Sequence, residues 1–391
     1  MSKIVFFCIP AHGHTNPTLG VVRELTARGH QVRYYSYEPF RQAIEAAGAQ
    51  FISCEQYAPE PPEDAGSRKV VEDLSVAMQV LADTTLALGE PICRALQEDR
   101  PDCIVYDSMA VWGKAIARKL DIPSVCSTTT FAFNRYSARI MKQSPGAALK
   151  TLLTLPRANR QVRRLQKAGY PFRNALDIMQ SDDTTETVVY TSPGFQPCSE
   201  TFSDHVAFVG PSVRPITQVP ETDDCLPLIY VSLGTVLNDA AAFYRSCLEA
   251  FRDLPCQAIL SVGQTVKLQD LGHIPENCRV YPTVDQIGVL SKANIFVTHC
   301  GMNSVSEALS YGVPLVTYPQ TTEQLGIARR VEELNAGLRL EGDTPQAIRQ
   351  AVDRLLQTPS CIRAAQRIAR GFRSCPGAAG AADRIEAMCR R

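Results

Sequence analysis

The sequence lacks an excess of charge of either sign, a long apolar run and any short cysteine motif. Its 391 residues carry 40 basic and 40 acidic side chains, so we do not expect the basic face of a dedicated nucleic-acid binder. The apolar run at residues 4–10 is far shorter than the roughly 20 residues of a membrane-spanning helix, and its flanks do not fit a signal peptide. These absences predict a globular protein, which we expect in the cytoplasm.

The 14 cysteines contain no C-x-x-C pair, and several lie in apolar, strand-like runs, among them Cys8, Cys103 and Cys126. This spacing argues against a disulfide framework or a zinc site and favours buried free thiols in a reducing compartment. The sequence also has no D-x-D pair and no cluster with metal-ligand spacing, so no metal is expected. The absence of G-x-S-x-G argues against a serine nucleophile.

Short β-branched runs alternate with longer helical patterns in both halves of the chain. Strands are predicted at 4–9, 31–36, 103–106 and 124–127, and again at 228–232, 257–261, 295–298 and 315–318. Short apolar strands between helices, such as those predicted at 16–28 and 303–311, are typical of a parallel sheet covered on both faces. The sequence therefore predicts an α/β protein with two Rossmann-like doubly wound domains that face each other across a cleft.

A proline-rich, polar stretch at 209–224 has no apolar period and is predicted to be an interdomain linker. It separates an expected N-terminal domain, 1–208, from an expected C-terminal domain, 225–375. The last predicted helix, 376–391, has no strand to follow it, and we expect it to pack back on the N-terminal domain.

The loop at 10–17 follows the first predicted strand. Gly13 permits a tight turn there, and Thr15 or Asn16 is expected to cap a helix that Pro17 opens. Histidine has an ordinary pKa of about 6.5, so His14 can accept a proton at neutral pH. Asp107 follows another predicted strand on the same rim and can orient the imidazole. The pair predicts a base acting on a substrate hydroxyl, and a purely helix-capping role for His14 is the open alternative.

A second loop, at 298–304, also follows a predicted strand and opens a helix. Free amides and the helix dipole make such a helix start an anion site suited to phosphate. Side chains of this loop and of the turn after strand 228–232 can add hydrogen-bond donors: His299, Asn303, Ser304 and Thr235.

A third loop, at 319–324, ends in Glu323 and Gln324. A carboxylate beside an amide can bind vicinal hydroxyls of a sugar. The open alternative is that the two side chains only cap the following helix.

At these loops the sequence resembles the UDP-glycosyltransferases of glycosyltransferase family 1, in the bacterial branch of macrolide and flavonoid glycosyltransferases. The resemblance covers nearly the whole chain and is strongest at 10–28 and 228–324. Residues 281–324 are similar to the donor-binding signature of the family. The resemblance implies the GT-B fold, with two facing Rossmann-like domains, and transfer of a sugar from a nucleotide sugar.

The resemblance implies a role for each matching residue. The segment from Gly13 to Pro17 matches the family motif G-H-x-x-P, which makes His14 the general base, and Asp107 matches its acidic partner. The matches to donor-binding positions are Gln286 and Glu307 for the ribose, Gly13, Thr235, His299, Gly301, Asn303 and Ser304 for the nucleotide phosphates, the main chain of Val284 for the base, and Glu323 and Gln324 for the transferred sugar.

The sequence departs from the family at the start of the signature. The usual W-x-P-Q is here Thr283-Val284-Asp285-Gln286, so the tryptophan that would stack on uracil is absent and Asp285 replaces proline. The single tryptophan of the chain, Trp112, lies in the other half. The choice between a uridine and a thymidine donor therefore stays open. Glu323 stands where many members have aspartate, which bears on the preferred sugar.

The activity implied is an inverting, metal-independent transfer of a sugar, expected to be glucose from UDP-glucose, to a hydroxyl of a small hydrophobic acceptor such as a macrolide or flavonoid. The nucleotide sugar is a co-substrate, and no cofactor and no nucleic-acid partner are expected. Three alternatives stay open. They are a transferase for a lipid-linked or anionic acceptor at a membrane surface, a sugar-nucleotide epimerase, and a non-catalytic nucleotide-sugar binder.

The stretch 122–176 contains no acidic residue and ten basic ones. One interpretation is a solvated helix face, balanced by the acidic residues of 177–204. The other is transient contact with an anionic acceptor or membrane surface, because clustered cations attract anionic lipid.

Overall fold

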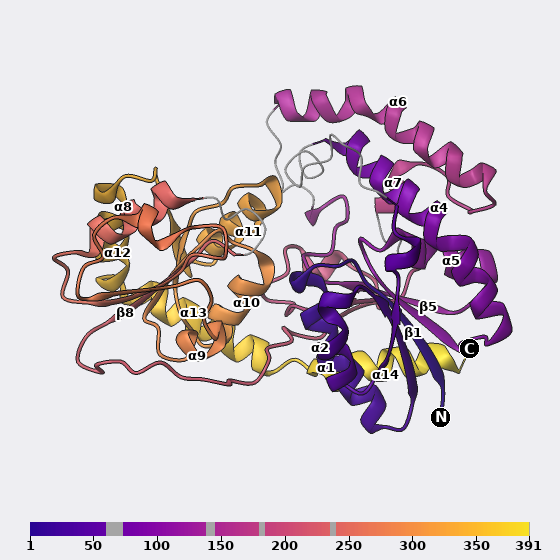
Figure 1. Ribbon diagram of the computed structural model, residues 1–391, viewed down its shortest axis with the longest axis horizontal. Helices are drawn as coiled ribbons and strands as arrows, with labels where there is room; N and C mark the ends of the chain where they lie inside the picture. Colours follow the sequence, from indigo (N-terminus) through magenta and orange to yellow (C-terminus); the bar gives the residue numbers. More distant parts are fainter. Residues whose placement is uncertain (60–72, 138–144, 180–183, 235–239, 391) are drawn as a thin grey trace. The chain divides into compact units, whose positions relative to one another are not determined.

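The computed structural model describes residues 1–59, 73–137, 145–179, 184–234 and 240–390. The chain forms two compact units, and each has its own parallel sheet (Figure 1). Unit 1 comprises Met1–Ser212 and Cys375–Arg391, and unit 2 comprises Val213–Ser374. Within the described ranges, no helix has the length and apolarity needed to cross a membrane.

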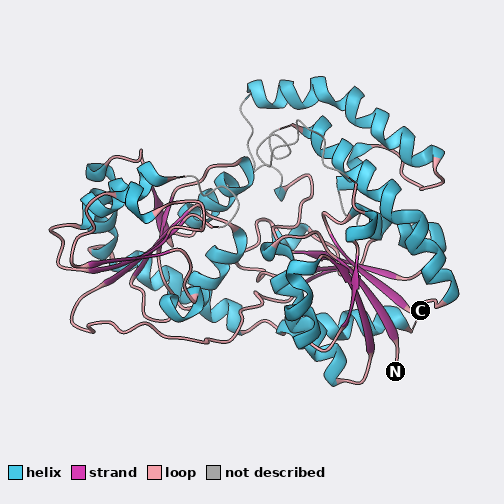
Figure 2. Ribbon diagram, in the orientation of Figure 1, coloured by secondary structure: helices cyan, strands magenta, loops and turns pink. Residues whose placement is uncertain are grey.

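The described part of unit 1 contains seven parallel strands in the order β3-β2-β1-β4-β5-β6-β7. Figure 2 shows the strands of this sheet with helices around them. Successive side chains of a strand point to opposite faces, so β1 sends Ile4 and Phe6 to one apolar cluster and Val5 and Phe7 to another. Both faces are buried, which explains the continuous apolar runs. The strands are β1 (Lys3–Phe7), β2 (Gln31–Ser36), β3 (Gln50–Ser53), β4 (Cys103–Asp107), β5 (Ser124–Thr128), β6 (Thr187–Val189) and β7 (Val206–Phe208).

Helices cover both faces of this sheet. The cluster that contains Ile4 also includes residues of α1 and α14, while the cluster that contains Val5 includes residues of α4 and α5. Helix α6 packs on α4, with Ala158, Val162 and Leu165 buried in a third cluster (Figure 1). The helices are α1 (His12–Ala27), α2 (Arg41–Ala46), α4 (Leu74–Glu98), α5 (Val111–Leu120), α6 (Pro145–Lys167), α7 (Ala175–Met179) and α14 (Gly377–Cys389).

Helix α1 begins at His12, so the predicted start at residue 16, with Thr15 or Asn16 as its cap, is wrong. The Ala11 amide donates to the carbonyl of Ile9 over 2.8 Å, which turns the chain directly after β1. The Ala11 carbonyl then accepts the amides of His14 and Thr15. Pro17 is tolerated near the helix start because its fixed φ is already helical. His14 therefore lies in the first helical turn and not in an extended loop.

The described part of unit 2 contains six parallel strands in the order β10-β9-β8-β11-β12-β13. They are β8 (Leu228–Ser232), β9 (Gln257–Ser261), β10 (Cys278–Tyr281), β11 (Ile295–Thr298), β12 (Leu315–Thr317) and β13 (Gly337–Arg339). The main cluster of this unit combines these strands with α8 and α12. The helices are α8 (Ala241–Phe251), α9 (Gln286–Leu290), α10 (Met302–Ser310), α11 (Thr322–Glu333), α12 (Pro345–Leu356) and α13 (Pro359–Arg373).

Both sheets have the doubly wound strand order, which confirms the predicted fold class. In each sheet the first strand lies centrally, with the second strand on one side and the fourth on the other. The strand order therefore reverses between β1 and β4 in unit 1 and between β8 and β11 in unit 2. Ligands of open α/β sheets bind at such reversal points, beyond the carboxyl ends of the strands.

Helix α14 is part of unit 1 although unit 2 precedes it in the sequence. Its buried residues Ala381, Ala382, Ile385 and Met388 complete the cluster beneath β1. Arg28, directly after α1, bonds to Asp383 over 2.6 Å and to Glu386 over 3.2 Å. The helix is thus held by an apolar face and by a polar contact at its side.

Candidate active site

His14 and Asp107 lie at the reversal point of the unit 1 sheet. Asp107 is the last residue of β4, and His14 follows the neighbouring β1 through the short turn into α1. The His14 Nδ1 atom is 2.8 Å from Asp107 Oδ2. The carboxylate side chain is 0% exposed and the imidazole 24% exposed, so a buried charge holds a ring that reaches solvent. The sequence analysis predicted both residues and their proximity.

Two further contacts orient this pair. The amide of Met109 donates to Asp107 Oδ1 over 2.8 Å, which fixes the carboxylate. The Thr129 hydroxyl, just after β5, lies 3.2 Å from His14 Nδ1. Thr129 was not predicted from the sequence, although the pairing of β4 with β5 brings the ends of both strands together. Because Nδ1 faces Asp107, the Nε2 atom is the one that can take a proton from a substrate.

Gly13, predicted to contact the nucleotide phosphates, lies beside His14 in the first turn of α1 and is exposed. Gly13 belongs to unit 1, whereas the other predicted donor-binding residues belong to unit 2. Thr235 lies outside the described residues.

His299 occupies the reversal point of the unit 2 sheet, directly after β11. Its ring is enclosed by two glycines: a Cβ on Gly234 would lie 2.6 Å from His299 Cε1, and one on Gly301 would lie 2.7 Å from Nε2. Gly234 follows β8 and has a φ of +80°. The left-handed backbone and the close approach of the ring both favour glycine at 234, whereas at Gly301 the close approach alone does so.

Burial lowers the pKa of His299 to about 4, and a hydrogen bond to the backbone of Ser232 only partly opposes this shift. The ring is therefore neutral at physiological pH. Its Nδ1 atom is buried and has no hydrogen-bond partner among the described residues. An unpaired buried polar atom is costly, so His299 is suited to a polar ligand as a neutral ring and not as a cation.

Helix α10 begins next to this ring. Gly301 is its N-cap residue and makes no side-chain cap, so the first amides of the helix have no side-chain acceptor from that residue. Asn303 and Ser304 follow in the first turn and are partly exposed. The structure thus brings His299, Gly301, Asn303 and Ser304 together at one helix start, as the sequence predicted.

Gln286 and Glu307 are bonded to each other. Gln286 Nε2 donates to Glu307 Oε2 over 2.5 Å and approaches the Ser304 hydroxyl at 3.3 Å, while Tyr230 donates to Gln286 Oε1 over 3.1 Å. Desolvation raises the pKa of Glu307 above its usual value, although the bond from Gln286 opposes the shift. The network joins β8, α9 and α10. Val284, predicted to present its main chain to the base, lies just before α9 and is partly exposed.

Gln324 acts as a helix cap, the alternative that the sequence left open. Thr321 and Gln324 form a capping box at the start of α11, in which Gln324 Oε1 accepts the amides of Gln320 and Thr321. Glu323 is exposed in the first turn of the helix. The role predicted for both residues, binding of the transferred sugar, stays a prediction.

The basic residues of α6 lie mostly on its outer side. Arg157, Arg160, Arg163 and Lys167 are exposed, and their spacing of three or four residues places them on one side of the helix. Two other cations are paired: Arg164 with Asp83 over 2.8 Å, and Arg173 with Asp177.

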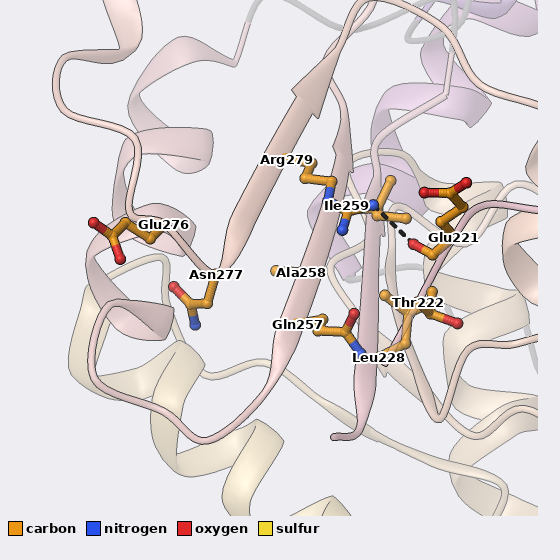
Figure 3. Close-up of a pocket in the computed structure, with 9 residues that line it drawn as sticks. All are labelled: Glu221, Thr222, Leu228, Gln257, Ala258, Ile259, Glu276, Asn277 and Arg279. Atoms are coloured by element: carbon orange, nitrogen blue, oxygen red, sulfur yellow. Dashed lines mark hydrogen bonds between the residues drawn. The ribbon is translucent and has the colours of Figure 1, made fainter. Parts of the chain in front are cut away.

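A small pocket of unit 2 lies at the opposite edge of the sheet, where strands β8 to β10 begin (Figure 3). Arg279 crosses it and donates to the Glu221 carbonyl over 2.8 Å. None of the predicted site residues lines it. In an open α/β sheet this is not the ligand-binding edge.

Comparison with known proteins agrees with this geometry. The family model described as the C-terminal domain of erythromycin biosynthesis protein CIII-like proteins matches residues 246–388. The NDP-glycosyltransferase YjiC of Bacillus licheniformis is 36% identical, over 98% of this chain and 97% of that protein. The demethyllactenocin mycarosyltransferase of Streptomyces fradiae is 33% identical, over 99% of this chain and 87% of that protein.

A solved structure extends the similarity to the three-dimensional fold. The calicheamicin glycosyltransferase CalG4 has a TM-score of 0.81 and 30% identity, with 100% of this chain and 99% of that chain covered. The similarity therefore includes both units. The chain belongs to glycosyltransferase family 1 and is a glycosyltransferase of the GT-B fold.

Proposed function

We propose that this enzyme transfers a sugar, with inversion and without a metal ion, from a nucleotide sugar to a hydroxyl of a small natural product such as a macrolide or flavonoid. UDP-glucose is the donor proposed first. The contact between His14 and the buried Asp107 carries the proposal, because this pair is suited to deprotonating a hydroxyl. The relatives named for demethyllactenocin and oleandomycin support a natural-product acceptor.

Unit 1 supplies the base in this mechanism. The acceptor hydroxyl gives its proton to His14 Nε2 while its oxygen attacks the anomeric carbon of the donor. The bond from that carbon to the nucleoside diphosphate breaks in the same step, and the configuration inverts. Asp107 stabilises the imidazolium that forms, through the bond to Nδ1.

Unit 2 supplies the donor-binding residues. The amides at the start of α10 face the negative charge that develops on the diphosphate, and the helix dipole has the favourable sign. Neutral His299 adds a polar contact there. Gln286 and Glu307 take the ribose hydroxyls, and the main chain of Val284 takes the base. Dipole and side chains neutralise the leaving group in place of a metal ion.

The test is acceptor-dependent release of nucleoside diphosphate by the native chain and by His14→Ala. We expect the variant to lose on the order of 10²-fold or more in rate, the usual share of a general base. His12→Ala is the matched control, since His12 is an exposed neighbour in the same helical turn, with its ring tilted against that of Phe40. Near-native transfer by His14→Ala would contradict the mechanism. TDP-sugars are tried if UDP-glucose is inactive, and turnover without acceptor would indicate an epimerase.

We also propose a cytoplasmic location, supported by 14 free cysteines, ten of them buried. The exposed cations of α6 support transient contact with an anionic surface in that compartment. Co-sedimentation with phosphatidylglycerol vesicles at low salt tests this contact. The variant Arg157→Gln/Arg160→Gln/Arg163→Gln should bind less, and Arg164→Gln, a paired cation, is the control. Absence of binding by the native chain removes the proposal.

A further inference from the structure

Asp285, which replaces the proline of the family pattern, has partners in a segment distant in sequence. Its Oδ2 accepts the Thr217 amide over 2.7 Å, the Thr217 hydroxyl over 2.6 Å and the Gln218 amide over 2.8 Å. Arg214 Nη2 lies 2.9 Å from Oδ1, and the carboxylate side chain is 8% exposed. Burial alone would raise the pKa of Asp285, but these bonds hold it well below its usual range.

The segment 214–218 therefore lies directly on α9. A Cβ on Gly288, inside α9, would come within 1.6 Å of the Gln218 carbonyl oxygen, so backbone meets backbone there. Asp285 is the N-cap residue of α9, yet its side chain makes no cap bond to that helix. The carboxylate of Asp285 instead joins the start of α9 to the segment 214–218. Part of the predicted linker 209–224 is thus a fixed element of unit 2.

The residue after Asp285 is Gln286, which bonds to Glu307 in α10 and accepts from Tyr230 in β8. Helix α9 has only five residues, too few to hold its position by internal hydrogen bonds alone. Arg214 and Asp285 also lie near enough to act electrostatically on the Glu307 carboxyl, with opposite signs. The contacts of Asp285 therefore determine both the position of Gln286 and the charge around Glu307.

We propose that Asp285 is a positioning residue for the nucleotide-sugar donor. By holding residues 214–218 against α9, it sets Gln286 and Glu307 at the spacing needed to bind a vicinal diol such as a ribose. Three hydrogen bonds and an ion pair fix this position, where the family pattern has a proline. This proposal rests on the proposed function, because it assumes that a nucleotide sugar binds at these residues.

The experiment measures binding of UDP and TDP to the full chain by calorimetry, together with KM for donor and acceptor and the melting temperature. Asp285→Ala should weaken nucleotide binding and raise the donor KM by about tenfold or more, since each tenfold step corresponds to about 1.4 kcal/mol and charged hydrogen bonds are worth that much. The acceptor KM should stay native. Asp285→Asn, which keeps the shape and loses the charge, should show a smaller change in the same direction and serves if Asp285→Ala does not fold.

Asp223→Asn is the matched control. Asp223 lies in the same predicted linker, 209–224, and accepts the Cys225 amide over 2.9 Å, with no bond to α9. The Asp223→Asn variant should leave the KM values for donor and acceptor unchanged. A lower melting temperature for Asp285→Ala and Asp285→Asn with native donor KM and nucleotide affinity would overturn the proposal, because the contact would then only stabilise the fold. Failure of the native chain to bind any nucleotide would overturn the proposed function as well.

Discussion

A histidine lies at the reversal point of each sheet: His14 follows the first strand of unit 1, β1, and His299 follows the fourth strand of unit 2, β11. His14 reaches solvent and contacts the buried carboxylate of Asp107. His299, which is also partly exposed, has its ring between Gly234 and Gly301 and bonds to a backbone group. The same side chain, next to a reversal point in both units, therefore has two chemistries. A charged partner prepares one ring to take a proton, and desolvation keeps the other neutral.

The largest expected effect comes from removing the charge beside His14. Asp107→Asn should lower the transfer rate on the order of 10²-fold, because the imidazolium loses its counter-charge and the ring its preferred orientation. The measurement is kcat with a saturating donor. The double variant His14→Ala/Asp107→Asn should be no slower than His14→Ala alone, because the two residues act as a unit. Asp102→Asn, at the other end of β4, is the control. Additive losses would contradict a shared role.

A smaller effect is expected from the pH dependence of stability at His299. The folded pKa of about 4 lies below the unfolded value of 6.5, so the unfolded chain binds more protons between these values. The contribution of neutral His299 to the free energy of unfolding is fully present above pH 6.5 and is lost as the pH falls towards 4. Between pH 7 and pH 4.5, the free energy of unfolding of His299→Gln should therefore fall by about 2 kcal/mol less than that of the native chain. Urea titrations at both pH values measure this difference.

His12→Gln, which makes the same change at an exposed histidine, is the matched control. Identical losses for the native chain and His299→Gln would show that the partly buried ring of His299 does not resist protonation. The contrast with His14 would then rest on geometry alone.

The smallest effect is expected at Thr129. Its hydroxyl contacts the same nitrogen of His14 as Asp107 does, without a charge. Thr129→Val should therefore reduce kcat only severalfold, in line with about 1 kcal/mol for a neutral hydrogen bond. Thr130→Val is the matched control, because the Thr130 hydroxyl is buried and has no hydrogen-bond partner among the described residues. A loss as large as that of Asp107→Asn would give the hydroxyl an equal part in orienting the ring.

The sequence predicted the parts of this comparison that depend on local pattern. Central strands such as β8 are continuous apolar runs, and polar residues at strand ends, among them His14 and Asp107, converge because parallel strands share an edge. The start of α1 was misplaced because Gly13 and Pro17 usually mark a turn. The anchoring of Asp285 could not be predicted, since its partners are about 70 residues away in sequence and their pairing depends on tertiary packing.

Helix α14 has a consequence for the order in which the molecule is made. Unit 1 needs Ala381, Ala382 and Ile385 to close its core, and these residues are translated after all of unit 2. At about 5–20 residues per second, the first 212 residues leave the ribosome tens of seconds ahead of their last helix. During synthesis, the apolar side chains beneath β1 therefore lack the cover of α14 at the time when all residues of unit 2 have already been made. The unit that begins first is the one that finishes folding last.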